Sequence, residues 1–214
     1  MTDLLEKLGF LGVVPVIAIE RSEDAVELGK ALLAGGLPCA EITFRTAAAE
    51  EAIRQISSSL PEIIVGAGTV LSVDQADRAV SAGAQFIVSP GFNQKVVDWC
   101  LQNEIPVTPG VLTPTEIDMA LDRELKILKF FPAEAMGGIA TLKAIAAPYG
   151  GVKFIPTGGI NPKNLADYLS LPAVHACGGS WLVASKLISA GEFAEITRLA
   201  EEALAIVRQV RGGQ

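Results

Sequence analysis

The sequence is poor in the residues that most metal enzymes and hydrolases need. Its 214 residues include a single histidine, His175, and three cysteines, Cys39, Cys100 and Cys177. Zinc hydrolases and metal-dependent aldolases use two or three histidine ligands, and most catalytic triads need a histidine base. The cysteines are odd in number and widely spaced, so neither a disulfide framework nor a CxxC metal site is indicated. We therefore expect no metal and no cofactor.

Basic surfaces and long apolar runs are missing as well. The 17 Lys and Arg residues are outnumbered by 24 Asp and Glu residues, which gives a formal net charge of −7, whereas a nucleic-acid surface needs clustered basic residues. The longest apolar run, 13–19, is too short to cross a bilayer, and the acidic N-terminus lacks the apolar segment of a signal peptide. These absences predict a cytoplasmic protein without a nucleic-acid or membrane partner.

Short apolar runs alternate with helical patterns along the whole chain. The expected strands lie at 13–19, 39–44, 62–65, 85–88, 105–108, 125–131, 153–155 and 174–177. Capping residues open several of the helices between them, at Ser22, Ser72, Thr113 and Asn161. A terminal helix is expected over 192–211.

Many of these strand candidates are continuously apolar, as is typical of a parallel sheet covered on both faces. Eight strand–helix units close most economically into a barrel. A doubly wound open sheet is the alternative, but no GxGxxG fingerprint follows the first strand. We therefore predict the α/β class, with residues 1–214 forming one (β/α)8 TIM barrel and a C-terminal helix.

One lysine interrupts the sixth strand candidate. Among the nine lysines, Lys129 alone has two large apolar residues on each side, and alternation places it on the same face as Ile127 and Phe131. Burial disfavours an ammonium, and a neutral amine can attack a carbonyl to form a Schiff base. We interpret Lys129 as a nucleophile. The alternative is an ion-paired lysine, or one whose amine reaches the rim.

Polar residues share one face of the second strand candidate. Glu41, Thr43 and Arg45 alternate with Ile42 and Phe44. A carboxylate can transfer protons, and a guanidinium can bind a carboxylate or a phosphate with two parallel hydrogen bonds. We interpret Glu41 as a proton-transfer group and Arg45 as an anion-binding group. A Glu–Arg ion pair that braces a loop is the alternative.

Glycine pairs follow the seventh and eighth strand candidates, at Gly158-Gly159 and Gly178-Gly179, with Ser180 directly after. Phosphate in barrels frequently binds at these two strand ends, held by backbone N–H groups. Tight turns also use such pairs. After the third and fourth strands, Thr69 can hydrogen-bond a substrate carboxylate or carbonyl, and Pro90 with Phe92 can form a wall of the pocket.

A buried amine, a carboxylate, an anion-binding arginine and a phosphate cradle together describe a narrow chemistry. They fit a phosphorylated α-keto acid that is cleaved or formed through an iminium. Lys129 would attack the C2 ketone. Glu41, through a water, would remove the C4 hydroxyl proton as the C3–C4 bond breaks. Hydrolysis would then release pyruvate.

Six segments resemble the 2-keto-3-deoxy-6-phosphogluconate (KDPG) aldolase family, including its 4-hydroxy-2-oxoglutarate (KHG) aldolase members. They are EITFRT (41–46), GAGTV (66–70), SPG (89–91), KFFPAE (129–134), PTGGI (156–160) and GGSWL (178–182). The resemblance implies a (β/α)8 barrel, class I aldol cleavage and a homotrimer. It also implies cleavage of KDPG to pyruvate and glyceraldehyde 3-phosphate, and of KHG to pyruvate and glyoxylate.

The same resemblance implies the roles of individual residues. Lys129 matches the Schiff-base lysine and Glu41 the general acid/base. The positions that match substrate-binding residues are Arg45 and Thr69 for the carboxylate, Thr157 and Pro90 along the site, and Gly158, Gly159, Gly179 and Ser180 for the phosphate.

Three other functions stay open at this point. A galactonate aldolase of the same family would share Lys129 and differ in how it reads the distal hydroxyls. A phosphate-binding barrel could isomerise or decarboxylate its substrate without an iminium, although such enzymes usually need pairs of acidic or histidine side chains. A non-enzymatic barrel could bind sugar phosphates alone.

Overall fold

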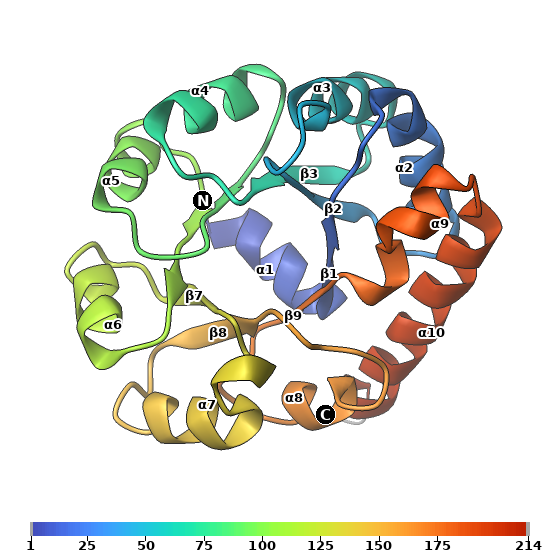
Figure 1. Ribbon diagram of the computed structural model, residues 1–214. Helices are drawn as coiled ribbons and strands as arrows, with labels where there is room; N and C mark the ends of the chain where they lie inside the picture. Colours follow the sequence, from blue (N-terminus) through green and yellow to red (C-terminus); the bar gives the residue numbers. More distant parts are fainter. Residues whose placement is uncertain (1, 213–214) are drawn as a thin grey trace.

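The computed structural model describes residues 2–212, in which parallel strands form a ring surrounded by helices (Figure 1). The strands are β1 (Val13–Ile17), β2 (Cys39–Thr43), β3 (Ile64–Gly68), β4 (Ile87–Val88), β5 (Val107–Thr108), β6 (Gly110–Val111), β7 (Ile127–Phe130), β8 (Lys153–Pro156) and β9 (Cys177–Gly179). The α-helices are α1 (Thr2–Leu11), α2 (Ala25–Ala34), α3 (Ala49–Ser59), α4 (Val73–Ser81), α5 (Gln94–Gln102), α6 (Pro114–Leu121), α7 (Gly138–Ala146), α8 (Leu165–Leu169), α9 (Ser185–Ser189) and α10 (Phe193–Arg211). Short 3-10 helices precede α2, α7 and α9, at Ser22–Asp24, Glu134–Met136 and Trp181–Val183.

The strands close into a barrel. Hydrogen-bonded neighbours run in the orders β5-β4-β3-β2-β1-β9 and β6-β7-β8. β5 and β6 are two halves of one strand position interrupted at Pro109, whose carbonyl oxygen accepts the N–H of Lys129 at 3.0 Å. Isolated bridges, one of them between Thr157 and Gly178, join β8 to β9. The predicted (β/α)8 barrel with a C-terminal helix is confirmed.

Two strands lie further along the chain than predicted. β3 ends at Gly68 and β9 at Gly179, whereas the predicted strands end at 65 and 177. In the sequence, the glycines of these segments suggest turns. One of them, Gly66, is instead required by close packing, since a Cβ there would lie 2.3 Å from the ring of Phe86. The other predicted strands contain the observed ones or end one residue short.

Two predicted helix starts have the expected caps. The Ser72 hydroxyl accepts the N–H of Gln75 at the start of α4. At α6, Thr113 and Glu116 form a reciprocal capping box. The helix after Ser22 begins as a 3-10 turn and becomes α-helical at Ala25.

The helix expected to start at Asn161 begins later, at Leu165. The side chain of Asn161 accepts the N–H of Lys163 at 3.0 Å, and the side chain of Asn164 accepts the N–H of Asn161 at 2.8 Å. These side-chain hydrogen bonds hold the chain in a turn and compete with the helical pattern.

Helix α1 is not among the helices predicted from the sequence, and it closes the end of the barrel opposite the carboxyl ends of the strands. It lies within the ring of strands in Figure 1, and its buried Leu8 borders a small cavity inside the barrel. The His175 Nε2 atom lies 2.8 Å from the carbonyl oxygen of Leu5, and Arg211 donates to the carbonyl of Gly9. The single histidine therefore holds α1 in place, as a structural residue.

The outer helices complete the core. The terminal helix α10 covers β1, α2 and α8 with an apolar face that includes Ile196, Ala200 and Leu204, as predicted for 192–211. Cys39, Cys100 and Cys177 are buried among apolar residues, and burial raises the pKa of Cys100 to about 12. Among residues 2–212, no helix has the length and apolar composition to cross a membrane.

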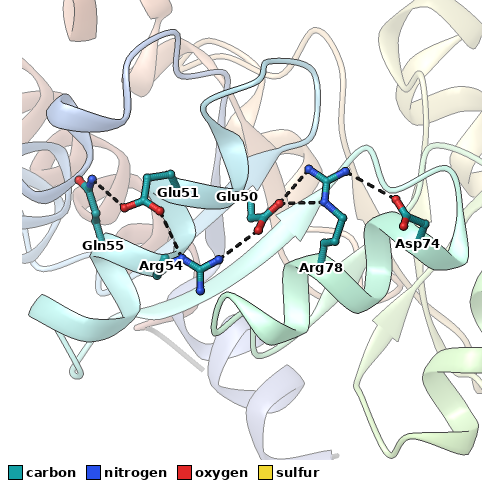
Figure 2. A network of polar contacts seen from close by, with 6 residues as sticks. All are labelled: Glu50, Glu51, Arg54, Gln55, Asp74 and Arg78. Carbon is teal, nitrogen blue, oxygen red and sulfur yellow. Dashed lines mark hydrogen bonds and ion pairs between the residues drawn. The ribbon is translucent and has the colours of Figure 1, made fainter.

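Charged residues form a network on the outer surface, where α3 and α4 lie side by side (Figure 2). Glu50 accepts hydrogen bonds from Arg54 at 3.0 Å and from Arg78 at 2.8 Å. Asp74 lies 3.6 Å from Arg78, and Glu51 extends the network to Gln55. This surface network links two consecutive strand–helix units.

Candidate active site

A lysine and a glutamate meet inside the barrel. The Nζ atom of Lys129 on β7 lies 3.4 Å from Oε1 of Glu41 on β2, and their side chains are only 6% and 5% exposed. Figure 1 shows β2 and β7 on opposite sides of the ring. Because the two side chains nevertheless meet, both point inward. The amine is a buried, ion-paired group inside the barrel and does not reach the outer rim.

A glycine on the neighbouring strand makes room for the carboxylate. Gly68 pairs with Thr43 in the parallel register of β2 and β3. A Cβ atom at Gly68 would lie 2.1 Å from Oε1 of Glu41 and 2.8 Å from its carboxyl carbon. Any side chain there would displace Glu41, so Gly68 maintains the geometry of the pair.

A cavity of about 280 Å³ opens above the amine at the carboxyl ends of the strands. Its lining residues are Val16, Arg45, Thr69, Pro90, Lys129, Phe131, Thr157, Gly158, Gly159, Ile160, Gly178 and Ser180. The charged ones, Lys129 and Arg45, are both cationic. A volume of this order suits a small ligand, and the charges favour an anionic one.

The structure brings most of the predicted site residues to this cavity, with two exceptions. Glu41 lies below it and borders the small interior cavity together with Lys129 and Thr157. Gly179 is not part of the lining, because it packs against Trp181, where a Cβ would lie 2.3 Å from the indole ring. Gly178 faces the cavity in its place.

Left-handed backbone conformations occur along the cavity wall. Thr69 has φ of 56°, which is uncommon for a residue with a side chain, and Gly158 and Gly159 have φ of 99° and 85°. Such conformations concentrate at functional sites. The two glycines adopt theirs without the steric cost that a Cβ would add.

A buried tyrosine supports the glycine turn from behind. The Tyr168 hydroxyl donates to Oε1 of Glu134 at 2.5 Å, and the Glu134 side chain packs so closely under Gly159 that a Cβ there would lie 2.5 Å away. Burial, and then the Glu134 carboxylate, raise the pKa of Tyr168 above its usual range. The phenol therefore stays protonated and keeps donating at neutral pH.

Four lining residues are absent from the predicted site: Val16, Phe131, Ile160 and Gly178. Strand alternation already places Phe131 on the face of Lys129, and the Lys129 Nζ atom lies 5.2 Å from the centre of its ring. That signal was sufficient to include Phe131. Gly178 belongs to the second glycine pair, which was a signal for a phosphate site, although only Gly179 of that pair was assigned to the site. Val16 and Ile160 are apolar and carry no chemical signal in the sequence.

A wider groove of about 920 Å³ lies beside the cavity, between Leu71 and Asp98. Phe92 lines this groove and is absent from the lining of the cavity that contains Lys129, so the prediction that it forms a wall of the pocket is wrong for this cavity. Its ring contacts the guanidinium of Arg123 at 5.5 Å, which in turn pairs with Asp98. Because Lys129 lines the smaller cavity and not this groove, the smaller cavity is the candidate active site.

Within residues 2–212, no group of three or more His, Cys, Asp or Glu side chains is placed to hold a metal ion. The reactive groups of the cavity are the amine, the carboxylate, the guanidinium and several hydroxyls.

Comparisons with known proteins identify the family. A model of the KDPG and KHG aldolase family matches residues 5–199. The 2-dehydro-3-deoxy-phosphogluconate aldolase of Treponema pallidum is 50% identical over 97% of this chain and 99% of its own length. The KHG/KDPG aldolase of Escherichia coli is 48% identical over 90% of each chain.

Solved structures agree with this assignment. The KDPG aldolase of Legionella pneumophila is 42% identical and superimposes with a TM-score of 0.88, over 91% of this chain and 96% of its own. That structure holds pyruvate captured as a covalent carbinolamine intermediate. The chain described here belongs to the KDPG and KHG aldolase family, whose members are carbon–carbon lyases.

Proposed function

We propose that this chain is a class I aldolase that cleaves 2-dehydro-3-deoxy-6-phosphogluconate to pyruvate and glyceraldehyde 3-phosphate. The observation that carries this proposal is the buried Lys129 amine, 3.4 Å from the Glu41 carboxylate at the bottom of a cavity that opens at the strand ends. A phosphorylated keto acid is the small-molecule partner that the cationic lining favours.

Lys129 forms the covalent intermediate. Its neutral amine attacks the C2 ketone of the substrate to give a carbinolamine, which loses water to become an iminium. The positive iminium then accepts the electron pair of the C3–C4 bond as that bond breaks. Glu41 lies close enough to take the proton that the ammonium must first lose. It gives this proton to the carbinolamine hydroxyl, which leaves as water, and Glu41 becomes a carboxylate again.

Glu41 transfers the remaining protons. Through a water, it removes the C4 hydroxyl proton, so the leaving half of the substrate departs as an aldehyde. The same carboxyl group then returns a proton to C3 of the enamine. Addition of water to the resulting iminium releases pyruvate and frees the amine of Lys129.

Residues along the cavity bind the two ends of the substrate. Arg45 and Thr69 hold the carboxylate, and Thr157 and Pro90 line the reacting carbons. At the other end, backbone N–H groups of Gly158 and Gly159 and the hydroxyl of Ser180 hold the phosphate. Gly179 lies behind the cavity wall, and its role is to hold the backbone that leads from β9 to Ser180.

Cleavage of 4-hydroxy-2-oxoglutarate to pyruvate and glyoxylate is a second candidate function. It uses the same amine and carboxylate and makes no use of the phosphate end. The relatives do not favour the galactonate alternative. A non-enzymatic barrel is also disfavoured, because it would have no use for a buried amine beside a carboxylate.

The expected homotrimer and the cytoplasmic location remain predictions. The trimer comes from the family resemblance alone, and the location comes from the composition of the sequence. Size-exclusion chromatography with light scattering tests the trimer, and fractionation of cells tests the location.

Trapping with borohydride tests the proposed function. The protein is incubated with pyruvate, reduced, digested and analysed by mass spectrometry. We expect the mass of a reduced pyruvate adduct on the peptide that contains Lys129, and no adduct in Lys129→Ala. Lys126→Ala is the matched control, because Lys126 is an exposed lysine just before the same strand. A folded wild-type protein without an adduct would refute the class I mechanism.

A further inference from the structure

Thr43 is the last residue of β2, two residues after Glu41 and two before Arg45, which lies in the turn that follows the strand. Thr43 is only 1% exposed. Its hydroxyl donates a hydrogen bond of 2.7 Å to the carbonyl oxygen of Ile17, the last residue of β1. It accepts a second one, of 3.0 Å, from the Nε atom of Arg45. A hydroxyl has one proton and two lone pairs, so the bond to Ile17 turns a lone pair toward Arg45.

Arg45 depends on this contact for its orientation. The side chain is long, has many rotamers and lines the cavity. Within residues 2–212, its terminal nitrogens make no hydrogen bond or ion pair with another residue. A guanidinium held at Nε, with its outer edge unoccupied, presents two parallel N–H groups to a planar anion.

We propose that Thr43 is a positioning residue that aims the guanidinium of Arg45 at the substrate carboxylate. This inference rests on the proposed function, in which Arg45 binds that carboxylate. The end of β1 holds the Thr43 hydroxyl, and the hydroxyl holds the Nε atom of Arg45. The conformational entropy of the Arg45 side chain is therefore already lost before substrate binds.

The chain offers a matched control a few residues away. The Thr46 hydroxyl donates to the carbonyl oxygen of Ile19 at 2.6 Å, just as Thr43 donates to Ile17, and it makes no bond to Arg45. Thr46→Val therefore removes a similar link between the same two segments. Thr43→Val removes that link together with the contact to Arg45.

Steady-state kinetics and adduct formation test the proposal. We expect Thr43→Val to raise KM roughly tenfold to hundredfold, the range for a hydrogen bond to a charged group, with kcat changed by less than about threefold. Thr43→Ser, which keeps the hydroxyl, and Thr46→Val should stay within about twofold of the wild type. In an Arg45→Ala background, Thr43→Val should have no further effect, because the two residues act together.

A neutral carbonyl compound distinguishes a misoriented Arg45 from general damage to the site. The pyruvate concentration that gives half-maximal adduct should rise in Thr43→Val, whereas the corresponding value for acetaldehyde, which has no carboxylate, should not. Equal losses for both compounds, or full additivity with Arg45→Ala, would overturn the proposal. If the valine variant does not fold, Thr43→Ala takes its place, because alanine introduces no new atoms.

The failure of this inference is distinguishable from failure of the proposed function. Wild-type protein that traps pyruvate on Lys129, beside a Thr43→Val variant with unchanged half-saturation, refutes the role of Thr43 alone. Wild-type protein that traps nothing refutes the aldolase mechanism, and the role of Thr43 with it.

Discussion

Basic and acidic side chains pair in two very different places. One is the surface network between α3 and α4, and the other is the buried pair inside the barrel. In the network, Arg54 and Arg78 are 48% and 52% exposed, and their contacts to Glu50 are 3.0 and 2.8 Å long (Figure 2). The single contact between Lys129 and Glu41 is longer, at 3.4 Å, and nearly inaccessible to water. Short distances between charges therefore do not mark the important pair.

Burial explains the difference. Water and salt screen exposed ion pairs, which contribute little to stability. Removing water from an amine and a carboxylate is costly, and that cost is tolerated where the groups take part in chemistry. Variants in the two regions test whether burial decides how much each charged group matters.

Replacing the buried lysine should have the largest effect. Lys129→Met replaces the unbranched apolar stem of the side chain and removes the nucleophile, so turnover of KDPG should fall to background. Lys126→Met, an exposed lysine nearby, should retain native turnover. A coupled assay for pyruvate measures both. Residual turnover above background in Lys129→Met would mean that another group forms the covalent intermediate.

Neutralising the carboxylate should slow turnover and spare the adduct. Glu41→Gln retains the shape of the side chain and removes its ability to transfer protons, so kcat should fall roughly 10²–10⁴-fold. The borohydride adduct with pyruvate should still form on Lys129. A variant that turned over at the native rate would contradict the role given to Glu41.

Crowding the carboxylate should have a smaller effect of the same kind. In Gly68→Ala, the new Cβ would lie 2.1 Å from Oε1 of Glu41, so the carboxylate must move. Misplacement of a catalytic group by about 1 Å can cost around 10²-fold in rate. We expect a fall in kcat of up to that size. Gly150→Ala is the control, since nothing lies within 4 Å of its added Cβ.

Changing the surface network should have the smallest effect. Glu50→Gln removes the charge that Arg54 and Arg78 share, yet the pairs are exposed. We expect native kcat and KM and a Tm lower by at most about 2–4 °C. In about 1 M NaCl the difference should shrink because salt screens the pairs. Glu62→Gln, another exposed glutamate, provides the reference, and a larger loss would show that the network is structurally essential.

The sequence was sufficient to predict the chemical groups of the site. Period-two alternation places Glu41, Thr43 and Arg45 on one face, and the apolar neighbours of Lys129 predict its burial. The barrel follows from eight apolar strands, each with a helix after it. These inferences succeed because they depend on local spacing, which the fold preserves.

Features that depend on contacts between distant segments could not be predicted in this way. Whether Gly178 or Gly179 faces the cavity depends on the register of β9, and a shift of one residue exchanges the faces. The need for glycine at 66 and 68 arises from Phe86, just before β4, and from Glu41 on β2. Likewise, α1 is stabilised by packing under the barrel and by His175, far away in sequence.

The position of α1 has a consequence for the order of events during turnover. Because that helix closes one end of the barrel, substrate and products enter and leave through the opening at the carboxyl ends of the strands, above the amine. In the proposed mechanism the pyruvate half of the substrate is bound covalently to Lys129 at the bottom of the cavity, so the aldehyde half lies nearer the opening. Glyceraldehyde 3-phosphate therefore departs first, and water follows the same route inward to free the pyruvate.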